Sequence, residues 1–141
     1  MNGPSLNLLG TREPCIYGTE TLADIERRVR SAASELQVDV EFAQRNGEGD
    51  LIDCIHAWRG HVQGAVINPG AYGHTSLAIR DALAAVEVPY AEVHLTNIFA
   101  REPERHRLML AGGAVAVLCG FGAVGYELAL RGLAARLSSR G

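Results

Sequence analysis

The sequence contains no lysine, because all 13 of its basic residues are arginine. A lysine amine commonly activates a ketone through a Schiff base, so the absence of lysine excludes that chemistry. The Walker A phosphate loop also requires a lysine, which excludes this class of nucleotide site. An enzyme built from this chain must therefore activate its substrate without an imine.

The few cysteines, the lack of long apolar runs and the negative net charge exclude further classes of protein. The three cysteines, Cys15, Cys54 and Cys119, have no close spacing and are interpreted as free thiols in a reducing cytosol. No apolar run approaches the roughly 20 residues of a membrane span, and no basic leader precedes an apolar stretch. The net charge of -3 gives no electrostatic support for nucleic-acid binding. We therefore expect a cytoplasmic protein with neither membrane nor nucleic acid as a partner.

Hydrophobic periodicity predicts helices that alternate with strands. Helices are expected at 22–36, about 51–58, 76–86 and 123–137, and strands at 38–42, 64–68, 90–95 and 114–119. A chain of 141 residues with this alternation predicts a single domain, 1–141, of α/β class. The expected architecture is a flavodoxin-like, doubly wound parallel sheet in three layers. The chain opens on the turn sequence MNGPS, so we expect its first strand to be missing or truncated.

Polar residues that could form a site lie at the ends of two predicted strands. Asn68 and His74 lie in INPGAYGHTS, and Glu92 and His94 share one face of a strand because they are two residues apart. Asn68 could instead be a turn residue, and the Glu92–His94 pair a structural hydrogen bond. The segment AREPER (100–105) could be a solvated charged loop. Because ligands bind beyond the carboxyl ends of parallel strands, the convergence of these residues there favours a site.

The loop GTREPCIYG, at 10–18, shows no apolar period and carries Arg12 and Tyr17. Pro14 argues against a helix in it. Arg12 and Tyr17 therefore form a further polar cluster, on a loop that packs little.

A dinucleotide site is a competing interpretation, because GFGAVG at 120–125 follows a predicted strand and opens a helix. That fingerprint also needs a further strand with an acidic residue about 20 positions on, where the sequence has already ended. Close packing of a helix on a strand explains these glycines better. The five histidines show no metal-binding spacing, so we expect neither a cofactor nor a metal.

Several motifs together resemble those of type II 3-dehydroquinate dehydratases. They are NGPSLNLLGTREPCIYG, INPGAYGHTS, RDAL, EVHLTNIFARE and GFGAVGYELAL, in the order and at the spacing of that family. The resemblance implies a cofactor-free enzyme, usually a dodecamer built from trimers. Its reaction is the anti elimination of water from 3-dehydroquinate, through an enolate, to give 3-dehydroshikimate in the biosynthesis of aromatic amino acids. Alternatives are a dehydratase of a dehydroquinate analogue in secondary metabolism, or a binding relative without catalysis.

The resemblance also implies a role for each matching residue. Tyr17 would be the base, with Arg12 as its positive neighbour, and His94 would be the general acid, oriented by Glu92. The residues implied in substrate binding are Asn68, His74, Leu95, Thr96, Arg105 and, from a neighbouring subunit, Asp81. Ser5 stands where the family has an asparagine that helps to stabilise the enolate oxygen, so we expect reduced turnover.

Overall fold

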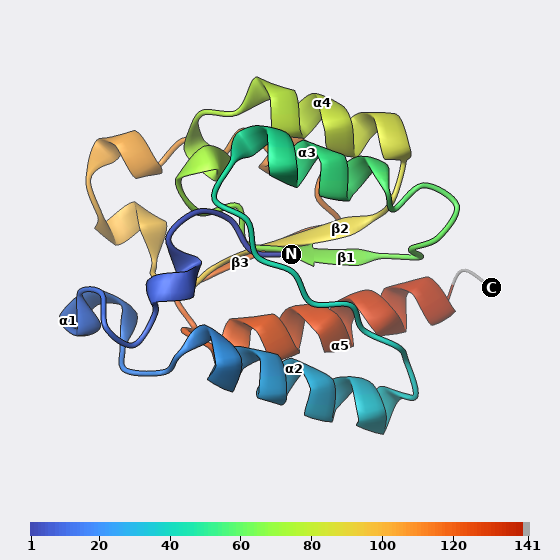
Figure 1. Cartoon of the computed structure of the whole chain (residues 1–141), viewed down its shortest axis with the longest axis horizontal. Helices are drawn as coiled ribbons and strands as arrows, with labels where there is room; N and C mark the ends of the chain where they lie inside the picture. The colour runs from blue at the N-terminus through green and yellow to red at the C-terminus, as the bar shows by residue number, and fades with distance from the viewer. Residues whose placement is uncertain (140–141) are drawn as a thin grey trace.

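A computed structural model describes residues 1–139 of the chain. Its sheet has three parallel strands in sequence order, β1 (Ala65–Ile67), β2 (Tyr90–His94) and β3 (Ala116–Cys119). Four longer helices flank it, α2 (Leu22–Leu36), α3 (Glu48–His56), α4 (Leu77–Val86) and α5 (Val124–Ser138). Helices α3 and α4 cover one face, and α2 and α5 cover the other (Figure 1). The predicted three-layer α/β fold is confirmed.

The central strand β2 is buried along its whole length and connects two apolar cores. On the α3 and α4 side, Ile55 and Ile79 are fully buried. On the α2 and α5 side, Ile25 and Tyr126 fill the space beneath Val93. Burial on both faces explains why the strand sequence is apolar almost throughout, with Glu92 and His94 as its exceptions.

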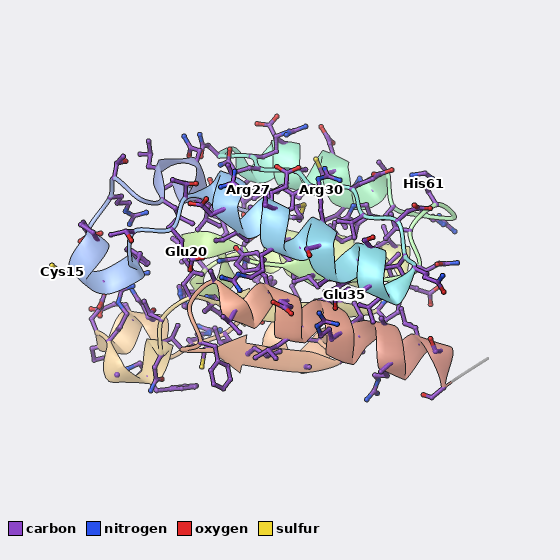
Figure 2. The ribbon with its side chains drawn as sticks, turned by 90° about the horizontal axis from the view of Figure 1, so that it is seen from below. Cys15, Glu20, Arg27, Arg30, Glu35 and His61 are labelled. Atoms are coloured by element: carbon purple, nitrogen blue, oxygen red, sulfur yellow. The ribbon has the colours of Figure 1, made fainter. Side chains whose placement is uncertain are left out.

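Helix α2 begins at the capping box that its sequence suggests. The Thr21 hydroxyl accepts a hydrogen bond from the Asp24 amide, and the Asp24 carboxylate accepts one from the Thr21 amide. Figure 2 shows Arg27 and Arg30 at the edge of this helix away from α5, and Glu35 at the edge toward α5. Glu35 accepts a hydrogen bond from Arg131 of α5 at 2.5 Å, which joins the two helices of this layer.

The predicted strand at 38–42 is wrong, because these residues form no strand in the structure. A strand requires a hydrogen-bonded neighbour, and alternation of side chains does not supply one. The place beside β1 holds only the first residues of the chain, where Asn2 makes isolated bridges to Gln44 and Asn68. The Met1 amino group donates to the Val66 carbonyl at 2.7 Å. Within residues 1–139, Asn2 thus pairs beside β1 through isolated bridges and not as part of a strand.

The loop at 10–18 also differs from its prediction, because it contains the one-turn helix α1 (Pro14–Tyr17). Proline fits the first position of a helix, where its missing N–H costs nothing, so Pro14 starts this turn and does not prevent it. None of the α1 residues is buried. Figures 1 and 2 show α1 at one end of the molecule, with Cys15 pointing outward.

The glycines of GFGAVG connect β3 to α5, and they agree with a packing role. Gly120 and Gly122 have φ values of +94° and +59°, a region that favours glycine. A Cβ on Gly125 would lie 3.4 Å from Val93 of β2, so the small residue brings the helix close to the sheet. Within residues 1–139, no helix is long and apolar enough to cross a membrane.

Candidate active site

The carboxyl ends of β1 and β2 open onto a cavity of about 160 Å³. This is the end of the sheet at which α1 and the segment after β2 lie (Figure 1). Among its lining residues are Ser5, Arg12, Tyr17, Asn68, His74, His94, Leu95, Arg101 and Arg105. Segments far apart in the sequence therefore bring most of the predicted site residues together.

Three predicted residues do not line this cavity. Glu92 lies fully buried behind His94, where it can act only through that histidine. Thr96 is half-buried and follows the lining residue Leu95. Asp81 lies on α4 with its side chain 73% exposed, 3.6 Å from Arg80. Its exposure leaves it available to another subunit, which is how the resemblance places it.

Two guanidinium groups approach Tyr17. The Arg101 Nη1 group donates a hydrogen bond of 2.8 Å to the Tyr17 hydroxyl, and both Arg12 and Arg101 lie over the ring, at 5.1 and 5.3 Å from its centroid. Tyr17 therefore has two positive charges near its ring and a hydrogen-bond donor at its oxygen. Arg12 is the more exposed of the two and is also paired with Glu13 at 3.3 Å.

The histidine and glutamate of β2 form a buried pair. His94 Nε2 lies 2.8 Å from Glu92 Oε1, with side-chain exposures of 7% and 0%. Because a carboxylate only accepts, Nε2 carries a proton in this contact, and Nδ1 is the nitrogen left to serve a substrate. A Cβ on Gly73 would lie 3.3 Å from both Glu92 Oε1 and His94 Cε1. The absence of a side chain at 73 therefore lets that segment pack directly on the pair.

His74 stacks on His94 with 5.5 Å between the ring centroids. Its Nδ1 donates to the Arg107 carbonyl at 2.9 Å, which leaves Nε2 as a hydrogen-bond acceptor. Burial lowers the pKa of His74, and the positive charges near it, including that of Arg105, lower it further. His74 is thus neutral, and its Nε2 can accept a hydrogen bond from a hydroxyl group.

Arg105 brings a positive charge to the cavity and is held in place by Glu102. The Arg105 Nε group donates to Glu102 Oε1 at 2.5 Å. This hydrogen bond lowers the pKa of the Glu102 carboxyl to about 2, so the pair stays ionised at any working pH. The remaining guanidinium nitrogens of Arg105 are suited to a hydroxyl or carboxylate of a ligand.

Ser5 adopts a left-handed backbone conformation, with φ of +66°. Its amide donates to the Asn46 side chain at 3.0 Å. Asparagine adopts this left-handed conformation more readily than most residues, and serine does not. The conformation gives a local reason for the asparagine that the resemblance expects at this position.

The family model for class II dehydroquinases matches residues 1–134. The chain belongs to this family. It is 59% identical to a 3-dehydroquinate dehydratase of Gemmatimonas aurantiaca over 94% of the chain and 88% of that protein. It is 58% identical to one from Chelativorans sp. over 97% of the chain and 95% of that protein. The type II dehydroquinase structure from Propionibacterium acnes superimposes with a TM-score of 0.91 at 42% identity, covering 95% of this chain and 92% of that one.

Arg101 is a charged residue of the cavity lining that the sequence analysis missed. It occurs in AREPER, four residues before Arg105, and that segment had the alternative interpretation of a solvated loop. The structure shows its side chain only 16% exposed and bonded to the Tyr17 hydroxyl. Arg101 follows the short helix at Ile98–Ala100, Arg105 ends the one at Pro103–Arg105, and both residues line the cavity.

Proposed function

We propose that this cavity removes water from 3-dehydroquinate, through an enolate, to give 3-dehydroshikimate. The chain is a hydro-lyase of the shikimate pathway, and its close relatives are named as 3-dehydroquinate dehydratases. One observation supports the assignment of residues most strongly. The Tyr17 hydroxyl, which accepts a hydrogen bond from Arg101, lines this cavity. His94 lines it too, and its buried partner Glu92 lies directly behind it. Tyr17 and His94 are a base and an acid, which are the two groups that an elimination needs.

The first step uses Tyr17 as the base. Its phenolate takes the proton from the carbon that lies between the ketone and the carbon bearing the departing hydroxyl. The electron pair of that C–H bond moves onto the ketone oxygen and forms an enolate. Arg101 and Arg12 place positive charge beside the Tyr17 oxygen and ring, and the absence of lysine agrees with a route through an enolate rather than an imine.

The second step uses His94 as the acid. The enolate collapses, a C=C bond forms, and the C–O bond to the hydroxyl breaks while His94 gives its proton to that oxygen, so water leaves. Glu92 stabilises the protonated ring through its 2.8 Å contact with Nε2. Tyr17 then loses its acquired proton and His94 regains one from solvent, which closes the cycle.

The remaining predicted lining residues, with Thr96 next to Leu95, hold the substrate. Asn68 binds the departing hydroxyl, and the backbone amides of Leu95 and Thr96, with the Thr96 hydroxyl, bind the carboxylate. His74 and Arg105 bind ring hydroxyls, His74 as an acceptor because its burial keeps it neutral. Helix α1 acts as a lid that carries Tyr17 over the substrate, which its lack of buried residues permits.

The direct test of this function is an ultraviolet assay with 3-dehydroquinate. The product has a C=C bond conjugated to a carboxylate, so its absorbance rises as water is lost. We expect multiple turnovers by the purified chain without added metal or cofactor. Binding of 3-dehydroquinate by calorimetry with no rise in absorbance would instead identify a binding relative and would contradict the assignment.

We also propose that the chain, 1–141, works as one dehydroquinase-like domain in the cytoplasm. Twelve copies assemble as a dodecamer built from trimers. Asp81, exposed on α4, then completes the site of a neighbouring subunit. Light scattering should give a mass many times that of a 15.1 kDa chain, and Asp81→Ala should reduce turnover. A fully active monomer, or an Asp81→Ala variant with unchanged turnover, would show that the cross-subunit role is wrong.

Ser5 is expected to limit turnover on 3-dehydroquinate. Loss of one hydrogen-bond donor to a developing oxyanion costs about a hundred- to a thousand-fold in turnover, and a bridging water recovers part of that loss. Ser5→Asn should therefore raise kcat at least several-fold with a smaller change in KM. Ser5→Gly is the matched control, because it relieves the left-handed conformation without adding a donor. If Ser5→Asn lowers kcat, Ser5 is an adaptation, and the substrate should be sought among dehydroquinate analogues.

A further inference from the structure

A buried series of hydrogen bonds passes behind the cavity and ends on Asn68. The Asn2 amide nitrogen donates to the Ala43 carbonyl at 3.1 Å, and Asn2 Oδ1 accepts from the Tyr126 hydroxyl at 2.7 Å. The Tyr126 oxygen in turn accepts from Asn68 Nδ2 at 2.9 Å, and Asn68 Oδ1 accepts from the Gly70 amide at 3.1 Å. Asn2, Asn68 and Tyr126 are exposed by only 0%, 3% and 2%.

The direction of each hydrogen bond in this series is determined by the one before it. The Ala43 carbonyl can only accept, so it fixes which end of the Asn2 amide faces Tyr126. The Tyr126 hydroxyl has a single proton, and it is used on Asn2 Oδ1. Its oxygen must therefore accept from Asn68, and an amide flip at Asn68 would place oxygen against oxygen. Burial raises the pKa of Tyr126, so the hydroxyl remains protonated and remains a donor.

We propose that Tyr126, held by Asn2, is a positioning residue that fixes Asn68 as a hydrogen-bond donor toward the substrate. The Nδ2 group of Asn68 has two protons, one of which is bonded to Tyr126. The second is left for an oxygen in the cavity that Asn68 lines. The inference rests on the substrate-binding role proposed for Asn68. It adds two residues that lie outside the cavity and belong to α5 and to the start of the chain.

The test begins with Tyr126→Phe, which removes the oxygen and leaves the ring in the core. Without that oxygen the Asn68 amide loses one of the two partners that select its orientation and keeps only the Gly70 amide, so we expect kcat to fall about ten- to a hundred-fold with little change in KM. Tyr90→Phe is the matched control. Tyr90 is also buried and donates to a backbone carbonyl, that of Leu110, but it belongs to the other core. The Tyr90→Phe variant should lose about as much thermal stability as Tyr126→Phe and keep the kcat of the original protein.

A double-mutant cycle with Asn68→Ala separates positioning from a structural role. If Tyr126 acts through Asn68, then Tyr126→Phe should cause almost no further loss of kcat once Asn68 has been replaced by alanine. Additive losses, or a Tyr126→Phe variant that behaves like Tyr90→Phe, would overturn the proposal. Asn68→Ala with the kcat of the original protein would overturn it by a different route, since the premise about Asn68 would then be wrong.

A second variant keeps the test valid if Tyr126→Phe does not fold. Asn2→Ala leaves the phenol in place but frees its proton to bond to Asn68 Oδ1, so the amide can flip. We expect the same pattern of lowered kcat and unchanged KM. Asn2→Ala with full kcat and a folded spectrum would contradict the proposed series, because the orientation of Asn68 would then not depend on it.

Discussion

Tyr17→Phe should lower kcat on 3-dehydroquinate by about a hundred- to ten-thousand-fold while substrate still binds. The change removes one oxygen atom, the one that accepts a hydrogen bond from Arg101, and keeps the ring that the two guanidinium groups contact. Phenylalanine cannot take a proton, so the first step loses its base although the cavity keeps its shape. Steady-state kinetics in the ultraviolet assay, with calorimetry for substrate binding, measure both quantities.

Tyr72→Phe is the control for this variant. Tyr72 is half-buried, and its hydroxyl donates to the Asn46 carbonyl at 3.2 Å, but it is not among the residues that line the cavity. It should keep near-native kcat. Near-native turnover by Tyr17→Phe would mean that another group is the base, and the assignment of the first step would be wrong.

His94→Ala should lower kcat by a similar factor, because the departing hydroxyl must then leave without a proton from the protein. The variant also leaves the buried carboxylate of Glu92 without its partner, so some loss of stability is expected. Thermal unfolding should be measured beside kcat to separate the two effects. Glu92→Gln should give a smaller loss of kcat, since the acid remains and only its stabilisation by charge is removed.

His61→Ala is the matched control for the histidine. His61 is exposed, pairs with Glu41 at 2.9 Å, and lies at the opposite end of the molecule from Cys15 of α1 (Figure 2). We expect no change in kcat. If His94→Ala retains the kcat of His61→Ala, the general acid lies elsewhere in the cavity.

The sequence predicted those elements whose pattern depends on local spacing. The buried strand β2 and the Glu92–His94 pair follow from the spacing of residues close in the sequence, which backbone geometry alone converts into contacts. The strand expected at 38–42 could not be settled in this way, because pairing depends on a neighbour distant in sequence. The alternation of apolar and polar residues is present at 38–42, but within the described residues this segment has no paired strand beside it.

The candidate site shows the same division. Its motif residues were predicted, whereas the role of Arg101 depends on a contact across 84 residues to Tyr17. No local pattern distinguishes an arginine that turns inward from one that is solvated. The left-handed conformation of Ser5 and the link from Tyr126 to Asn2 across 124 residues were likewise inaccessible, since both are properties of the packed chain.

Deuterium exchange tests most directly whether Tyr17 is the base and His94 the general acid. His94→Ala, Tyr17→Phe and an enzyme-free sample are each incubated with 3-dehydroquinate in D₂O, and NMR follows the proton on the carbon between the ketone and the carbinol carbon. The account predicts that His94→Ala exchanges this proton faster than the enzyme-free sample while forming little 3-dehydroshikimate, and that Tyr17→Phe does neither. Exchange by Tyr17→Phe as fast as by His94→Ala would contradict the account, because proton removal would then not depend on the tyrosine.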